Sequence, residues 1–276
     1  MAPRSIWNGT ITFGLVNVPV KVYSATESKS IHFHQVHLAD GARIEHRRVC
    51  PKEDKEVPND EIVKGYELSK GGFVELTKDE IAAAAGERSK LIDVEHFVEG
   101  DEIDPAYYDK TYYLGCGDDG EDAYRLLYRA LEKSGKVAIA RWVFHDRERL
   151  VAVRPLDDKI LALHTMNFHD EVVEVDDLDL PNPQRNPSDR EIEMAGKLVK
   201  SLAAKFEPES YEDTYREAVL TVIKRKAKGE EIVEEPEETK QQDSDDLMAA
   251  LEASLARARK VMHSPHHENG KRRKSA

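Results

Sequence analysis

Two arginines, a histidine and a cysteine stand close together in the stretch RIEHRRVCPKED, residues 43–54. His46 and Cys50 are separated by three residues, and imidazole nitrogen and thiolate sulfur are ligands that zinc accepts. A structural zinc site needs four ligands, commonly paired as C-x₂-C, and the only other cysteine is Cys116. The stretch is therefore half of a metal site without its second half. Arg47 and Arg48 favour another chemistry, which is contact with the phosphates of a nucleic acid.

Three histidines in HFHQVH offer a second place for a metal. His32 and His34 would share one face of an extended strand, a spacing that metals can use, and His37 follows them. No carboxylate or cysteine stands at a matching spacing nearby, so we interpret these histidines as polar or phosphate-facing strand positions.

The motif GCGDDG matches the dinucleotide pattern G-x-G-x-x-G through Gly115, Gly117 and Gly120. It follows a strand-like TYYL and precedes a predicted helix, as a dinucleotide site would. Pyrophosphate binds at a helix N-terminus through backbone amides, and the acids at 118, 119, 121 and 122 would crowd that position with negative charge. We favour an acidic loop that caps a helix, and a nucleotide-binding enzyme is the alternative.

Other catalytic signatures are missing from the sequence. There is no serine nucleophile motif, no phosphate-binding G-x₄-GK[ST] loop and no metalloprotease His-Glu pair. We therefore expect no catalytic residue, no metal and no cofactor. What the sequence does offer is arginine and lysine interleaved with strand residues, around 43–48 and again around 141–149. A solvated charged face explains those bases as well as phosphate contact does.

The elements that would position these bases are mainly strands in the first two thirds of the chain. TITFGLVNVPVKVYS alternates apolar residues with period two, and its phase changes near Gly14, which predicts a bend there. VAIARWVFHDRERLVAVRP predicts a hairpin with HDRER as its connection, and KILALHTMNF continues the strand pattern. Two helices interrupt the strands. One follows the capping box of Thr77 and Glu80, and the other covers Glu121 to Ser134 with Tyr124, Leu127, Tyr128 and Leu131 buried.

The last third predicts helices. Ser188 and Glu191 form a capping box before an apolar stripe at positions 192, 195, 199, 202 and 206. A second helix runs from Tyr211 to Lys228, and its lysines either suit the helix dipole or bind a partner. Residues 230–246 form an acidic linker, and a third helix at 245–262 would dock on a partner or on its own protein. The end, HHENGKRRKSA, is expected to be a short disordered tail.

Composition limits the class of protein. Hydrophobic residues make up 39% and charged residues 34% of the 276 positions, as expected for a compact part with solvated segments attached. The net charge of −13 is uneven, because residues 93–122 sum to −10 whereas 136–154 sum to +3. A nucleic-acid surface is therefore compatible with an acidic total. Without a long apolar run or a secretory signal, we expect a cytoplasmic, nucleoid-associated protein with no membrane partner.

Four long strings carry a family resemblance: RSIWNGTITFGLVNVPVKVYSATE, DEIVKGYE, EIDPAYYDKTYYL and GKVAIARWVF. Together they closely resemble the prokaryotic Ku family, from about Arg4 to Gly229. The resemblance implies a mixed, mainly β fold: a Ku-type β-barrel core with a bridge arm and peripheral helices, a helical C-terminal arm, and a ring-shaped homodimer that threads the duplex. The implied parts are the core at 1–187 with its bridge at about 24–66, the helical arm at 188–229, and the linker and tail at 230–276.

The function implied by the resemblance is sequence-independent binding of double-stranded DNA ends in non-homologous end joining. Family members recruit an ATP-dependent DNA ligase, ligase D, through the helical arm, and a general chromosomal DNA-binding protein is the alternative. Many members carry a lysine-rich tail, whereas this chain has only KRRK, and some have C-x-x-C where this one has CPKE. The candidate DNA-binding residues are Arg43, Arg47, Arg48 and Lys64 on the bridge, with Arg141, Arg147 and Arg149 as weaker candidates.

Overall fold

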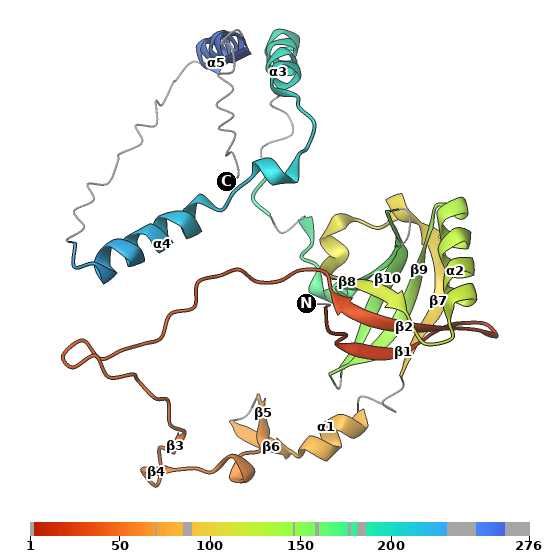
Figure 1. Ribbon diagram of the computed structural model, residues 1–276, viewed down its shortest axis with the longest axis vertical. Helices are drawn as coiled ribbons and strands as arrows, with labels where there is room; N and C mark the ends of the chain where they lie inside the picture. The colour runs from red at the N-terminus through yellow and green to blue at the C-terminus, as the bar shows by residue number, and fades with distance from the viewer. Residues whose placement is uncertain are drawn as a thin grey trace, which may run out of the picture. The chain divides into compact units, whose positions relative to one another are not determined.

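The computed structural model describes residues 3–69, 71–84, 90–145, 147–157, 160–175, 178–180, 186–230 and 247–262. The chain divides into two compact units, Met1–Leu178 and Asp179–Ala276. The first unit holds a β-barrel and a long excursion from it, and the second holds helices (Figure 1). Among the described residues, no helix is long and apolar enough to cross a membrane.

Seven strands close the barrel in the order β1-β2-β8-β11-β10-β9-β7. All neighbours are antiparallel except β1 and β7, whose parallel pairing at Ile11 and Ile92 closes the ring. The fold is therefore mixed and mainly β, with the expected barrel at its core. The strands are β1 (Trp7–Phe13), β2 (Val16–Ser24), β7 (Leu91–Glu99), β8 (Tyr108–Cys116), β9 (Lys136–Phe144), β10 (Arg147–Leu156) and β11 (Ile160–Met166).

The predicted change of phase near Gly14 is a tight turn. Gly14 has a φ of 59°, in the left-handed region that glycine adopts without strain, and it joins β1 to β2. The predicted hairpin of β9 and β10 is also confirmed. Its connection is shorter than HDRER, however, because Arg147, Glu148 and Arg149 pair with β9 and belong to β10.

The barrel core is built around Trp142, which is fully buried on β9. Its ring stacks on Phe144 at 4.3 Å between centroids and meets Trp7 and Tyr112 edge-on at 5.6 and 5.7 Å. Edge-on and offset-stacked contacts are the arrangements that aromatic quadrupoles favour. Alternate residues of the other strands complete the same core, among them Ile11, Val20, Leu114, Val151 and Leu163.

Helix α2 (Glu121–Ser134) packs on the barrel through the four side chains that the sequence predicts to be buried. The hydroxyl of Tyr124 donates to the carbonyl of Leu114 at 2.5 Å and accepts from the amide of Leu161 at 2.8 Å. This hydroxyl therefore joins β8 to β11, and burial raises the pKa of Tyr124. The helix ends at Gly135, whose φ of 69° fits the left-handed cap.

Between β2 and β7 the chain leaves the barrel for a long excursion, drawn in orange in Figure 1. We call residues 26–84 the arm. Its elements are β3 (Val49–Cys50), β4 (Lys55–Glu56), β5 (Lys64–Leu68), β6 (Gly72–Leu76), a 3₁₀ turn η1 (Asn59–Glu61) and helix α1 (Lys78–Ala84). No described side chain of the arm is buried, so the arm holds no core of its own. The excursion also extends beyond Tyr66, where the sequence places the end of the bridge.

The second unit contains α3 (Asp189–Leu202), α4 (Thr214–Ala227) and α5 (Leu247–Met262). The capping box of Ser188 and Glu191 is confirmed. Helix α3 ends at Leu202, so Phe206 lies beyond the stripe that the sequence predicts. Helix α5 packs on α3, which gives the third predicted helix a place on its own chain. The acidic linker from 231 to 246 and the tail from 263 lie outside the described residues. Short 3₁₀ turns occur at η2 (Gly100–Glu102), η3 (Pro105–Tyr107), η4 (His169–Glu171) and η6 (Pro208–Ser210).

Candidate nucleic-acid interface

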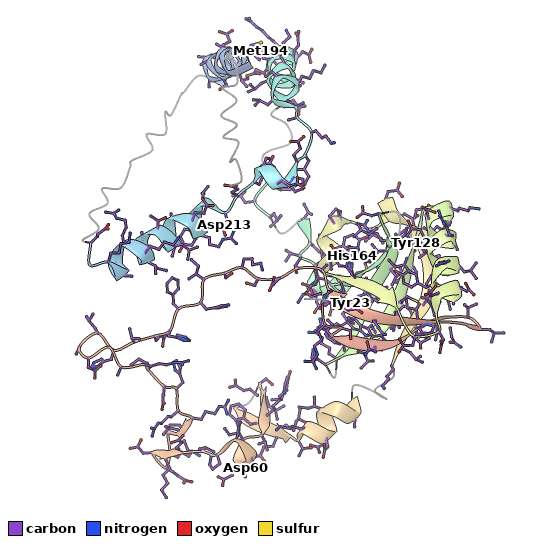
Figure 2. All side chains as sticks on the ribbon, viewed as in Figure 1. Tyr23, Asp60, Tyr128, His164, Met194 and Asp213 are labelled. Atoms are coloured by element: carbon purple, nitrogen blue, oxygen red, sulfur yellow. The ribbon has the colours of Figure 1, made fainter. Side chains whose placement is uncertain are left out.

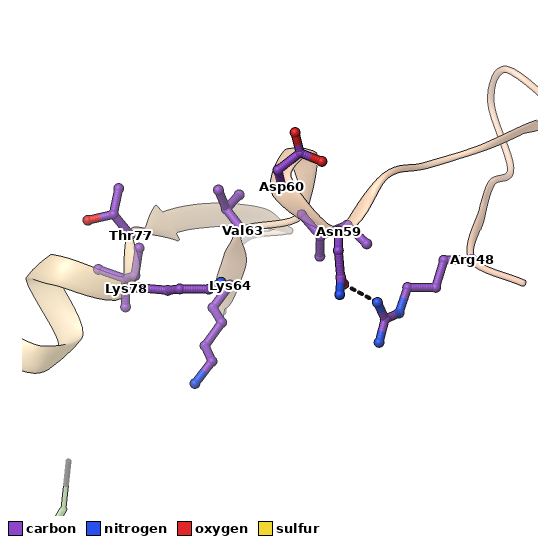
Figure 3. A pocket seen from close by; sticks show the side chains of 9 residues that line it. Arg48, Asn59, Asp60, Val63, Lys64, Thr77 and Lys78 are labelled. Carbon is purple, nitrogen blue, oxygen red and sulfur yellow. Dashed lines mark hydrogen bonds between the residues drawn. The ribbon is translucent and has the colours of Figure 1, made fainter. Parts of the chain in front are cut away.

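A groove of about 760 Å³ on the arm brings together three cationic side chains. Arg48, Lys64 and Lys78 line it, and we call it the basic groove. Figure 3 shows Arg48 and Lys64 extending to one side of the ribbon, while the carboxylate of Asp60 extends to the other. The remaining lining residues are Asn59, Asp60, Ile62, Val63, Leu76 and Thr77.

Local hydrogen bonds hold two of these cations in place. The guanidinium of Arg48 donates to the side-chain oxygen of Asn59, which begins η1. Lys78 is the first residue of α1, and Thr77 caps that helix by donating its amide and hydroxyl to Glu80, both at 2.8 Å. These two bonds lower the pKa of Glu80, so its carboxylate is committed to the cap. Lys64 begins β5 and pairs with Leu76 of β6.

The charges of the basic groove are not neutralised by the protein. Across the described part of the chain, no carboxylate lies within ion-pair distance of Arg48, Lys64 or Lys78. Cations that lack an internal partner and face solvent can bind an anion without first breaking an ion pair. A row of phosphates fits three such cations on one exposed segment.

A second, more open pocket on the arm contains Arg43, His46 and Arg47 together with Glu45 and Glu56. Arg47 lies 3.6 Å from the carboxylate of Glu56 and 3.9 Å from that of Glu45. Its charge is therefore partly shared with acids of its own chain. Arg47 and Arg48 precede β3 rather than lying on a strand, and their neighbour Cys50 is half-buried at the end of that strand.

The three barrel candidates lie on β9 and β10, and the structure brings them near carboxylates. Arg141 binds Glu95 at 2.8 Å and also Glu148, and both contacts raise the pKa of its guanidinium. Arg147 binds Glu171 at 2.9 Å. Their charges are thus already satisfied within the protein.

Arg149 differs from its two neighbours. Its Nε atom is buried, and among the described residues it has no hydrogen-bond partner. A buried donor that lacks a partner costs free energy, so Arg149 is less able to reach a ligand than a side chain at the surface.

The glycines of GCGDDG are explained by packing against β2. A Cβ atom on Gly117 would lie 2.7 Å from backbone and side-chain atoms of Pro19, and one on Gly120 would lie 3.0 Å from the Pro19 ring. The Gly117 amide also donates to the carbonyl of Pro19 at 2.9 Å, so that amide is not available to a phosphate. The strand before the loop, β8, has antiparallel neighbours on both sides, unlike the parallel βαβ unit of a dinucleotide site.

The histidines of HFHQVH do not gather with other ligands in the structure. His37 interacts through Nδ1 with the carboxylate of Asp40 at 2.9 Å, and the backbone around His32 and His34 has no regular structure. Within the described residues, no three His, Cys, Asp or Glu side chains come close enough together to hold a metal ion.

Comparison with known proteins identifies the family. The Ku70/Ku80 beta-barrel domain matches residues 12–194, which is most of the barrel unit together with the arm. The chain belongs to the Ku family. A non-homologous end joining protein Ku from Anaeromyxobacter sp. (strain K) is 48% identical over 93% of this chain and 86% of its own length. The Ku protein of Bacillus subtilis (strain 168) is 38% identical over 93% of this chain and 83% of its own. That of Archaeoglobus fulgidus is 40% identical over 91% and 98%.

These matches confirm the resemblance to prokaryotic Ku. They also place the chain in a non-catalytic family of DNA repair, which removes the nucleotide-binding enzyme as a reading of GCGDDG. Of the candidates named from the sequence, the structure brings Arg48 and Lys64 together, and it places Arg43 and Arg47 in a neighbouring pocket. Lys78 was missed, although the capping box of Thr77 and Glu80 already placed it at the start of a helix.

Proposed function

We propose that this chain binds the ends of double-stranded DNA, without regard to sequence, as a ring-shaped homodimer. In that ring the arm forms the bridge over the duplex, and the basic groove contacts sugar and phosphate. Contact with phosphates rather than base edges gives affinity for any sequence. The observation that carries this proposal is the basic groove itself, an exposed set of cations without ion pairs on the arm of a Ku-family chain.

Two features of the arm support the homodimer. Its large apolar side chains are exposed, including Phe33 at 69%, Tyr66 at 68% and Phe73 at 70%. Apolar surface of this extent on a segment without a core is typical of an interface that a partner covers. A second copy of the arm offers a matching apolar surface, as a two-fold interface requires.

We further propose that the helical arm at 188–229 recruits and stimulates the ATP-dependent ligase D, so that bound ends are joined. The protein would then contribute binding and positioning, and the ligase would contribute the chemistry. This assignment rests on family membership and on the separate helical unit that follows the barrel.

The experiment that tests the proposal compares linear and covalently closed circular duplex of the same sequence and length. A threading ring binds the linear form and is excluded from the circle, because a closed circle has no end. A general chromosomal DNA-binding protein would bind both forms with equal affinity, since both present the same phosphates. Equal affinity for the two forms would overturn the ring.

A further inference from the structure

The three helices of the second unit differ in how they are covered. Helices α3 and α5 pack on each other, and Leu255 of α5 is only 9% exposed although this unit contains no sheet. Met194, labelled on α3 in Figure 2, and Leu198 are half-buried. The spare amphipathic helix of this chain is therefore already used as a cover for α3.

Helix α4 has no such cover among the described residues, because no other element packs along it. Tyr215, Val219, Val222 and Ile223 follow the i, i+4, i+7, i+8 spacing that places them on one face. Tyr215 is 76% exposed and Ile223 is 40% exposed. This face is apolar and open to a partner.

Local signals define α4 in the absence of packing. Asp213, labelled in Figure 2, caps its first turn by accepting from the amide of Arg216 at 2.9 Å. Gly229 follows its end with a φ of 80°. A helix of 14 residues is marginal in water without tertiary contacts, so binding in a groove would stabilise it.

Charge along α4 decides between a protein and a nucleic acid as its partner. Glu212, Asp213 and Glu217 surround its beginning, whereas Lys224, Lys226 and Lys228 stand at its end. The acids would repel a phosphate backbone that ran along the helix. A protein groove that is apolar along its length and carries carboxylates at one end fits both the apolar face and the lysines.

We propose that α4, rather than α3, is the helix that docks on the ligase. The face of Tyr215, Val219, Val222 and Ile223 enters an apolar groove of the ligase, and Lys226 and Lys228 meet carboxylates at the end of that groove. This inference rests on the proposed recruitment of the ligase and names the surface that performs it. The pair of α3 and α5 then serves as a structural support that keeps α3 from competing for the same groove.

The experiment measures how much ligase is retained by the full-length protein on immobilised linear DNA. The variant Tyr215→Ala/Ile223→Ala truncates the exposed face of α4 with residues that favour helix. The matched control, Val199→Ala/Leu202→Ala, removes apolar side chains of α3 that are exposed by 69% and 65%. We expect the α4 variant to weaken ligase binding at least tenfold and the α3 variant to change it less than twofold, with DNA binding equal in both.

A charge-reversal variant, Lys226→Glu/Lys228→Glu, gives an independent readout. We expect it to weaken ligase binding more at low than at high salt, because screening reduces the lost attraction. If the wild-type protein retains ligase and the α4 variant retains it equally, the docking surface is wrong while recruitment stands. If the wild-type protein retains no ligase, recruitment itself is wrong. Loss caused by the α3 variant alone would reverse the assignment.

Discussion

Three cations with no ion-pair partner, Arg48, Lys64 and Lys78, distinguish the basic groove from the other basic positions of the chain. The difference at each position is set by the neighbour that the fold supplies. Arg141 meets Glu95, which is 46 residues away in sequence, whereas Lys64 meets only uncharged or distant groups. A cation that already holds a carboxylate must give up that contact to bind phosphate, so its net gain is small.

The double variant Lys64→Ala/Lys78→Ala should weaken binding to linear duplex equally for all sequences. Each phosphate contact that is lost makes the slope of log affinity against log salt concentration less steep by about 0.9. The slope is measured by titrating labelled duplex at several salt concentrations. Arg47→Ala is the control, because Arg47 shares its charge with Glu56, and we expect it to change the slope less. A slope that is the same in the double variant and the wild type would contradict the basic groove.

A buried histidine gives the barrel a dependence on pH. His164 on β11 accepts from Arg154 at Nε2 and interacts with the hydroxyl of Thr111 at Nδ1, at 3.2 and 2.9 Å. Burial, together with the charge of Arg154, lowers the pKa of His164 from 6.5 to about 4. The folded protein therefore keeps this imidazole neutral at pH values where the unfolded chain protonates it. Stability is fully present above the unfolded pKa and is lost as pH falls toward the folded one.

Between pH 7 and pH 5, the His164 contribution should lower the free energy of unfolding by about 2 kcal/mol. The measurement is denaturant unfolding at both pH values. The variant His164→Gln keeps an acceptor for Arg154 but does not titrate, so the loss between the two pH values should be smaller by that amount. An identical loss in variant and wild type would show that His164 does not govern this range.

The strands and helices show where local sequence suffices to predict structure. The buried face of α2 was predicted in full, because Tyr124, Leu127, Tyr128 and Leu131 follow the helical period without interruption. Strand β7 was missed, since Asp93 and Glu95 occupy its outward positions and made the segment resemble an acidic loop. A register shift between Val94 and His96 also breaks its alternation. The parallel closure of β7 on β1 is a long-range pairing that no local pattern specifies.

The arm was the hardest part to predict, for a physical reason. The alternation rule depends on one side of a strand facing a core, and the arm holds no core of its own. The family resemblance located the segment that contains Arg47 and Arg48, but it could not give the direction of either side chain. That direction follows from the contact of Arg48 with Asn59 and of Arg47 with Glu56.

The hairpin of β5 and β6 should be part of the dimer interface. Tyr66 and Val74 are opposite each other on one of its faces and are 68% and 45% exposed. A two-stranded hairpin is marginal in water, so a covering partner would stabilise it. We expect Tyr66→Glu/Val74→Glu to convert the dimer to a monomer, as measured by analytical ultracentrifugation. Leu15→Glu is the control, because Leu15 is fully exposed at a barrel turn away from the arm. Dimers of unchanged affinity in the hairpin variant would place the interface elsewhere.

At the scale of the whole molecule, the net charge of −13 and the binding of DNA are compatible because charge is segregated along the chain. Residues 93–122 carry a balance of −10, and they include exposed acids such as Asp118 at 88% side-chain exposure. DNA lying against such a surface is repelled, whereas DNA within a ring meets the cations of the arm. The acidic exterior thus favours the threaded arrangement over attachment from outside.

A threaded ring should stay on DNA under conditions that abolish its electrostatic affinity. If the protein is first bound to linear duplex and the ends are then joined, the resulting circle passes through a closed ring. Raising the salt concentration to about 1 M shortens the Debye length to about 3 Å and removes most phosphate attraction, but it does not open a topological link. We therefore expect the protein to remain on the circle and to leave an otherwise identical linear duplex, as followed by sedimentation of the DNA. Protein added after the ends are joined serves as the control and should be absent from the circle at high salt. Release from both forms at the same rate would show that contact alone, rather than threading, holds the protein on DNA.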